Sequence, residues 1–421
     1  MKSTLITIVI TILIIALPLA IIPKGELYNL PKIWILAIGG VALLILLLVN
    51  YKKLKLDKKD YVILVFAILI FISTMLSSSV KTSIIGEKNR YEGMIAFYTY
   101  ILIYFCAKKF LKYKNKEILL NILHAIYLII SILGILQYYI KMPTNVLYPI
   151  FNKGACGTFG NTNFMGSFIS MGIPVFIITY IMKNNKISFI TSLLVFFCLI
   201  ACRARSGWVA FIVFSIIMLA YLIKNKNKEY LKRAAILLLC FVMIFGVLYL
   251  PSNSKIRNKL DKTKEEVLIA KRSGTNDRLG SGRVQIWKIV IEVIKKYPIF
   301  GVGTDNLKNG IYENLTETNI DLIQKAKGII DKAHNEYLQI AVTLGIPALI
   351  VYLIFIGLII LPNIKKIFKQ EVIFIILSII ISYLVQAFFN ISTIGVAPLF
   401  WLTLGVLDNE IINNKQKLLK K

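Results

Sequence analysis

The chain has 421 residues, of which 57% are hydrophobic and only 17% are charged. A soluble domain has about 45–50% apolar residues, whereas here they form runs of about 16 to 25 residues, the length of membrane-spanning helices. These numbers exclude a soluble enzyme, a disordered chain and a disulfide scaffold. The formal charge of +29 lies mainly in short gaps between the apolar runs, so it argues against nucleic-acid binding.

Twelve apolar segments predict an all-α polytopic integral membrane protein. The first segment is longer than the core of a signal peptide and lacks a small-x-small cleavage site, so we expect a retained helix. The predicted spans are residues 4–22, 33–50, 61–78, 95–111, 118–140, 163–182, 187–202, 206–223, 234–250, 337–361, 372–389 and 393–407.

The distribution of Lys and Arg predicts the orientation. With a cytoplasmic N-terminus, 25 of the 50 Lys and Arg residues lie inside and nine lie in short outside loops. The remaining sixteen lie in the long loop 251–333, which the positive-inside rule does not count. This predicts cytoplasmic termini and three regions, namely helices 1–9 in 1–250, an extracytoplasmic loop in 251–333, and helices 10–12 with a basic tail in 334–421.

The long loop has helical patterning. Residues 283–297 carry apolar positions at helical spacing, and Pro298 then stops the helix, with Gly301 and Gly303 in a turn. Residues 318–333 resemble a second short amphipathic helix. We therefore expect a helical cap on the outer membrane face.

Two arginines stand at the outer end of the seventh span, in the segment C-R-A-R-S-G-W. Arg203 and Arg205 are two positions apart, so they do not share a helix face, and we expect one to point into a cavity. Outside arginines run against the positive-inside bias, which indicates a functional role for at least one of them. The alternative is that both reach phospholipid headgroups.

A second polar segment, G-A-C-G-T-F-G-N-T-N-F-M-G, precedes and begins the sixth span. Its glycines, with Asn161 and Asn163, are compatible with a tightly turned segment whose backbone N–H groups line a polar cavity and contact phosphate or sugar hydroxyls. The alternative is a simple turn with an N-cap from Asn161 or Thr162.

A third polar cluster, K-A-H-N-E-Y-L-Q, leads into the tenth span. An imidazole at this position, His334, is partly neutral and able to accept a proton. Asn335 and Glu336 follow it as candidate substrate-binding residues. His124, by contrast, lies among apolar residues of the fifth span, and we interpret it as a packed core residue.

Several signatures are absent from the sequence. No predicted span has an Asp or Glu in its middle, which disfavours an ion-coupled carrier, and no nucleotide-binding loop or metal-ligand cluster occurs. We therefore predict no cofactor and no metal. If the substrate is phosphorylated, guanidinium groups must balance its charge.

Four segments, in order, make the chain similar to the O-antigen ligase / Wzy O-antigen polymerase superfamily of bacterial membrane glycosyltransferases. G-T-F-G-N-T-N-F-M-G resembles G-T-F-G-N-P-N-F-L-G, and C-R-A-R-S-G-W resembles S-R-G-A-W with Arg205 on the family arginine. G-R-V-Q-I-W and Y-P-I-F-G-V-G-T resemble R-x-x-x-W…P-L-F-G-V-G, which places Arg283 on a second family arginine. A-H-N-E-Y-L-Q-I-A-V-T-L-G-I-P resembles H-N-x-Y-L-Q-x-x-x-E-x-G-x-x-G, and E-K-N-R-Y-E-G, which contains Arg90, is a weaker match.

The resemblance implies a transferase that uses an undecaprenyl-diphosphate-linked glycan at the outer face of the bacterial cytoplasmic membrane. The resemblance assigns Arg205, Arg283 and His334 to the active site, the arginines on the diphosphate and His334 as a candidate base for the acceptor. His334 alternatively only orients the diphosphate. Arg203 and Arg90 are further candidate substrate contacts.

Three functions remain open on the sequence alone. A ligase moves a finished glycan to a lipid, protein or glycan acceptor, whereas a polymerase joins repeat units that stay on the carrier. A flippase or other carrier of lipid-linked glycan is the third. We favour the ligase.

Overall fold

The computed structural model describes residues 2–22, 28–111, 113–140, 154–273, 280, 282–314, 320 and 330–419. These residues form helices and no strands, so the all-α prediction is confirmed for this part of the chain. The helices are α1 (Lys2–Leu19), α2 (Leu30–Val49), a 3-10 turn (Tyr51–Lys53), α3 (Lys58–Met75), α4 (Val80–Ile85), α5 (Met94–Phe110), α6 (Tyr113–Tyr139), α8 (Thr162–Lys183), α9 (Lys186–Ala201), α10 (Arg205–Asn225), α11 (Lys228–Tyr249), α12 (Lys255–Ser273), α13 (Arg283–Lys296), α14 (Leu307–Tyr312), α16 (Glu336–Leu344), α17 (Ile346–Ile364), α18 (Glu371–Ala387) and α19 (Ala397–Leu419).

Long apolar helices make this a multi-pass membrane protein. Six helical segments in the described residues are long and apolar enough to cross a bilayer, in α2, α6, α8, α10, α11 and α17, and α1, α9 and α18 contain shorter apolar segments. Each of the twelve predicted spans overlaps a helix, but length and composition confirm only six candidates. The count of twelve remains a prediction.

The predicted tenth span, 337–361, is wrong as one continuous helix, because the chain breaks at Gly345 into α16 and α17. Gly345 has φ +91°, and a Cβ there would lie 2.0 Å from the carbonyl oxygen of Ile299. The last turn of α16 is capped by the preceding loop, since the Gly303 N–H donates to the Thr343 carbonyl at 2.9 Å. The apolar pattern continues across this break, so hydropathy alone misses it.

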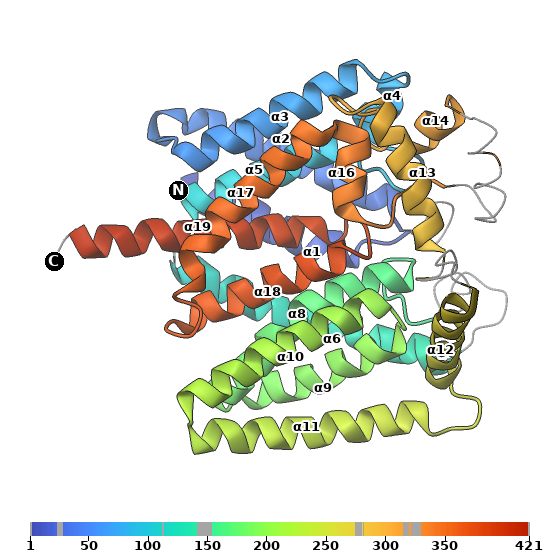
Figure 1. Cartoon of the computed structure of the whole chain (residues 1–421). Coiled ribbons are helices and arrows are strands. Elements are labelled where there is room, and N and C mark those ends of the chain that lie inside the picture. The colour runs from blue at the N-terminus through green and yellow to red at the C-terminus, as the bar shows by residue number, and fades with distance from the viewer. Residues whose placement is uncertain are drawn as a thin grey trace.

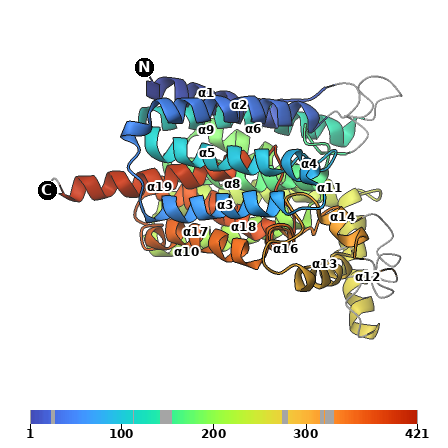
Figure 2. The same cartoon turned by 90° about the horizontal axis from the view of Figure 1, so that it is seen from above.

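The long helices run side by side, and the short helices gather at one end of the bundle (Figure 1; Figure 2). We call the end that carries α4, α12, α13, α14 and α16 the cap end, and the opposite end, where both chain ends lie, the terminal end (Figure 1). Helix α8 packs against α9, α10 and α18, and its residues from Phe164 to Ile181 are all buried.

The cap has its own apolar core. Ile289, Val290 and Val293 of α13 pack with Leu307 of α14 and Val342 of α16. Helix α13 ends one residue before its predicted end, with Tyr297 as its C-cap and Pro298 directly after that cap. The predicted helix at 318–333 lies mostly outside the described residues.

Candidate active site

Arg205 is the first residue of α10 and forms a two-pronged ion pair at the cap end. Its Nη1 and Nη2 donate to the Oε2 and Oε1 atoms of Glu266 on α12, at 2.7 and 2.9 Å. Both side chains are about one-fifth exposed, at 20% and 22%. Arg205 therefore presents its guanidinium fork at the bundle surface, beneath α12.

Arg203 points elsewhere, as the two-residue spacing predicts. It adopts a left-handed conformation with φ 55° in the turn before α10. A Cβ added to Gly154 would lie 3.6 Å from Nη2 of Arg203, so this guanidinium lies against the glycine-rich segment. The turn thus directs one arginine toward α12 and the other toward the segment before α8.

Two more cations complete a cationic cluster, which we define as Arg203, Arg205, Lys259 and Arg283. Burial lowers the pKa of Arg283, and the charge of Arg205 lowers it further, while Glu266 opposes the shift. The pKa of Lys259 is also lowered, first by burial and then by Arg205, with Arg203 and Arg283 adding to the shift and Glu266 opposing it. Lys259 therefore experiences the positive charges of Arg203, Arg205 and Arg283, and the Glu266 carboxylate opposes them.

His334 adjoins this cluster as a neutral imidazole. Burial lowers its pKa to about 4, and the positive charges of Arg283, Arg90 and Lys332 lower it further against the opposing effect of Asp331. Its backbone is left-handed, with φ 50°. An imidazole with this pKa is unprotonated at neutral pH, so it can accept a proton.

Trp287 explains the spacing of the R-x-x-x-W motif. Its indole Nε1 donates to the carbonyl oxygen of Ala333, the residue before His334, at 3.0 Å. Arg283 stands four residues earlier in the same helix, and residues at this spacing share a helix face. The tryptophan anchors α13 beside His334, and the arginine faces the same site one turn away.

Arg90 joins three segments near His334. Its Nε donates to Oδ2 of Asp331 at 2.7 Å, and its guanidinium lies 5.6 Å from the centroid of the Phe164 ring in α8. E-K-N-R-Y-E-G, the weakest of the sequence matches, therefore places Arg90 near His334, the predicted base.

A buried hub behind the site was missed by the sequence analysis. Lys332 forms ion pairs with Asp305 at 2.6 Å and with Glu92 at 3.3 Å. The other Asp305 oxygen accepts the backbone N–H groups of Glu87 and Glu92 at 2.8 and 3.0 Å. The hub holds the loops of Arg90 and His334 together. Each of the three residues lies in or directly after a segment singled out from the sequence: Glu92 in E-K-N-R-Y-E-G, Asp305 after G-V-G-T, and Lys332 in K-A-H-N-E-Y-L-Q.

The glycine-rich segment before α8 is a capped turn rather than an open cradle. Oδ1 of Asn161 accepts the N–H of Asn163 at 2.8 Å, as the N-cap alternative predicted. The N–H groups of Cys156 and Gly157 donate to Oε1 of Gln137 at 3.0 and 2.7 Å. These two amides are satisfied internally, so Cys156 and Gly157 are not among the N–H groups that the first interpretation expects to line a cavity. A substrate contact from Asn161 or Asn163 stays a prediction.

Asn335 and Glu336 both have local structural partners. Oδ1 of Asn335 caps α16 by accepting the N–H groups of Tyr337 and Leu338. The buried carboxylate of Glu336 accepts the hydroxyls of Tyr383 at 2.8 Å and Tyr352 at 3.2 Å. Their predicted binding role remains untested.

His124 is hydrogen-bonded and packed against an aromatic ring, as predicted, but it is half-buried rather than part of the buried core. Its Nε2 lies 2.9 Å from the hydroxyl of Ser188, and its ring meets the Phe176 ring edge-on at 4.7 Å. Among the described residues, no group of three or more His, Cys, Asp or Glu is placed to hold a metal ion.

Fold and site together define a multi-pass membrane protein with a cationic, histidine-containing site at one end of its helix bundle. Residues 190–353 match the family model described as O-antigen ligase, and this range contains the whole cationic cluster and His334. The resemblance seen in the motifs is therefore confirmed for residues 190–353, where the chain matches this family model.

Two relatives extend the comparison. The chain is 25% identical to an uncharacterized protein of Haemophilus influenzae over 362 residues, which are 84% of each chain. It is 24% identical to a ComP-specific O-oligosaccharyltransferase of Acinetobacter baylyi over 292 residues. The second match covers 63% of this chain and 47% of the Acinetobacter protein.

Proposed function

We propose that this protein is a metal-independent membrane glycosyltransferase of the O-antigen ligase type. It transfers a glycan from an undecaprenyl-diphosphate carrier to an acceptor hydroxyl or amide, at the outer face of the bacterial cytoplasmic membrane. The observation that carries the proposal is the convergence of four cations, from α10, α12, α13 and the turn before α10, beside a neutral His334. A diphosphate has the charge and the oxygen geometry that such a cluster binds.

The residues divide the chemistry between them. Arg205 and Arg283 bind the diphosphate, and the acceptor atom attacks the anomeric carbon as the bond to the diphosphate oxygen breaks. The leaving diphosphate takes the electron pair, and the arginines stabilise its growing charge. The acceptor proton passes to His334.

Donor binding should also raise the pKa of His334. The cations that hold the pKa of His334 near 4 include Arg283 and Arg90. A bound diphosphate offsets their charge, which raises the pKa of the imidazole toward its ordinary value. Burial, the largest cause of the lowered pKa, remains, but relief of the charge effect makes His334 a stronger base in the donor complex. Arg203 and Arg90 add further contacts to the donor, and Asn161, Asn163, Asn335 and Glu336 are the remaining candidates for binding the glycan.

Transfer by the purified full chain tests the proposal. In lipid vesicles that contain an undecaprenyl-diphosphate oligosaccharide and an acceptor, we expect new glycosidic bonds and release of the lipid diphosphate. Movement of the lipid-linked sugar across the bilayer without a new bond would identify a carrier instead.

Glycans from a deletion strain separate the ligase from the polymerase. A lost ligase leaves full-length glycan on the carrier, whereas a lost polymerase leaves single repeat units on the final acceptor. The name of the Acinetobacter relative favours the ligase.

Membrane orientation has its own test. Lys264 of α12 and Asn227 before α11 are both exposed, at the cap end and the terminal end respectively. In intact cells, a membrane-impermeant thiol reagent should label Lys264→Cys and not Asn227→Cys. The reverse pattern would place the site on the cytoplasmic side and contradict the proposal.

A further inference from the structure

Helix α12 lies across the cap end, beside the ends of the long helices (Figure 1; Figure 2). It carries Glu266, whose carboxylate takes both terminal nitrogens of Arg205, at 2.7 and 2.9 Å. Arg205 is one of the two arginines that the proposed function places on the donor diphosphate. The fork that should bind the donor is therefore occupied by a side chain of the protein itself.

A carboxylate and a phosphate compete for the same guanidinium geometry. Both bind the fork through two parallel N–H···O bonds, so both cannot use Nη1 and Nη2 at once. The remaining donor of Arg205, Nε, is buried and has no hydrogen-bond partner among the described residues. Because Nε is buried, a ligand cannot use it in place of Nη1 and Nη2. A phosphate must therefore displace Glu266 to bind Arg205 through two hydrogen bonds.

The charge of the site favours that exchange. Glu266 supplies one negative charge to Arg205, Lys259 and Arg283, and the repulsion among these three cations remains. A diphosphate brings more negative charge and more acceptor oxygens than one carboxylate. The Arg205–Glu266 pair is also about one-fifth exposed, so solvent and ligand can reach it.

We propose that Glu266 is a placeholder for a donor phosphate: it occupies the Arg205 fork in the empty site and is displaced when the lipid diphosphate binds. This inference rests on the proposed function and adds its regulation. Glu266 excludes weakly charged anions from the cationic cluster. Because the donor must displace Glu266, the apparent affinity for the donor is lower than it would be without this carboxylate.

Equilibrium binding of undecaprenyl diphosphate to the purified full chain tests the placeholder. Glu266→Gln removes the charge at nearly constant shape and should tighten binding roughly five- to thirtyfold. Glu266→Asp keeps the charge but shortens the reach to Arg205, and it should also bind more tightly than the wild type. Glu265→Gln, an exposed neighbour on the same helix, is the matched control and should bind as the wild type does.

A double variant separates competition from long-range repulsion. If Glu266 competes for the Arg205 fork, most of the gain from Glu266→Gln disappears when Arg205 is already alanine. Weaker binding by both Glu266 variants, or an undiminished gain without Arg205, would overturn the placeholder. A wild-type chain that fails to bind undecaprenyl diphosphate would instead refute the proposed function.

Discussion

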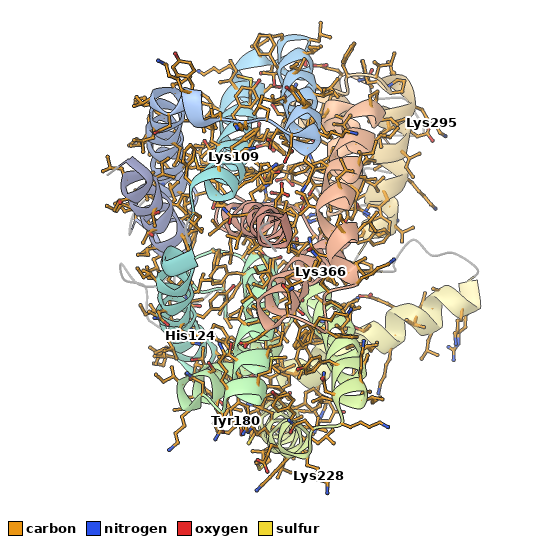
Figure 3. The ribbon with its side chains drawn as sticks, turned by 90° about the vertical axis from the view of Figure 1, so that its left-hand side faces the viewer. Lys109, His124, Tyr180, Lys228, Lys295 and Lys366 are labelled. Atoms are coloured by element: carbon orange, nitrogen blue, oxygen red, sulfur yellow. The ribbon has the colours of Figure 1, made fainter. Side chains whose placement is uncertain are left out.

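The two ends of the helix bundle hold charge clusters of opposite design. At the terminal end, viewed in Figure 3, the buried Lys108 Nζ lies 2.8 Å from Asp57, 2.7 Å from Asp60 and 2.8 Å from Asp408. Lys59 and Lys109 complete the network with further ion pairs to Asp408 and Asp60. Three lysines face three aspartates, so the network is balanced. At the cap end, Glu266 pairs with Arg205, and its carboxylate also acts on Lys259 and Arg283.

This difference distinguishes a structural network from the proposed binding site. Burying an unpaired charge is costly, so a balanced, buried network is stable only with all its members and has no room for a ligand. An unbalanced, partly exposed cluster is stabilised by an anion that arrives from outside. The cap-end cluster has the properties of a receptor for an anion, and the terminal-end network ties α3, α5 and α19 together.

The largest expected effects are losses of transfer at Arg283 and His334. Arg283→Ala should reduce transfer by roughly 10²–10³-fold, as for the loss of one group that stabilises developing charge. Arg283→Lys should fail almost as badly, because an ammonium cannot form two parallel hydrogen bonds to a phosphate. The measurement is the transfer rate of purified variants, with Lys295→Ala, an exposed lysine of the same helix, as the control. A lysine variant with near-normal transfer would contradict the bidentate contact.

His334→Ala should slow transfer by roughly 10²–10⁴-fold and leave the affinity for undecaprenyl diphosphate nearly unchanged. The physical reason is that a general base acts in the transition state rather than in donor binding. Single-turnover rates and equilibrium binding, measured on the same preparation, check both parts. A variant that loses donor affinity in proportion to its rate would show that His334 orients the diphosphate instead.

A variant of the terminal end should lose stability but keep donor binding. Lys108→Met leaves Asp60 and Asp408 buried with less compensating charge, and it should destabilise the protein by about 3–5 kcal/mol. Thermal unfolding in detergent measures this loss, and Lys58→Met, an exposed lysine of α3, should have little effect. The fraction of Lys108→Met that remains folded should bind undecaprenyl diphosphate normally. Lost binding by the folded fraction would mean that the two ends are coupled.

The pH dependence of kcat/KM should report the protonation of His334 in the free protein. Its pKa is lowered to about 4, and the neutral form is the base, so kcat/KM should be flat above about pH 5 and fall toward lower pH. Arg90→Gln removes a charge that lowers this pKa, so the inflection should move to higher pH. Rate profiles of the two proteins measure the shift, and an inflection that moves downward would contradict the assignment.

The smallest expected effect is that of chelation. Because the cationic cluster balances the diphosphate charge, transfer by the purified protein should be unchanged in excess EDTA. The assay compares initial rates with and without EDTA, and with added magnesium or manganese. Strict dependence on an added divalent ion would show that guanidinium groups do not suffice at the cap end.

Much of the helical architecture was predictable because hydropathy and charge act locally along the chain. Each predicted span overlaps a helix, and α13 was located to within one residue. The break at Gly345 was not predicted, because the apolar pattern is continuous there and the break depends on a loop packing against the end of α16. A contact between distant segments leaves no periodic signal in either of them.

The sequence by itself determined which residue types were available for the chemistry. Arg205, Arg283 and His334 were proposed for the site from their motifs, and Arg203 and Arg205, two residues apart, reach different segments, near Gly154 and at Glu266 respectively. Only the tertiary structure decided what surrounds them. Lys259 and Glu266 come from a helix with no recognised motif, and Lys332 pairs with Glu92 across 240 positions of chain. Charge balance depends on distances in space, and folding sets those distances by packing helices whose order in the sequence does not reveal their neighbours.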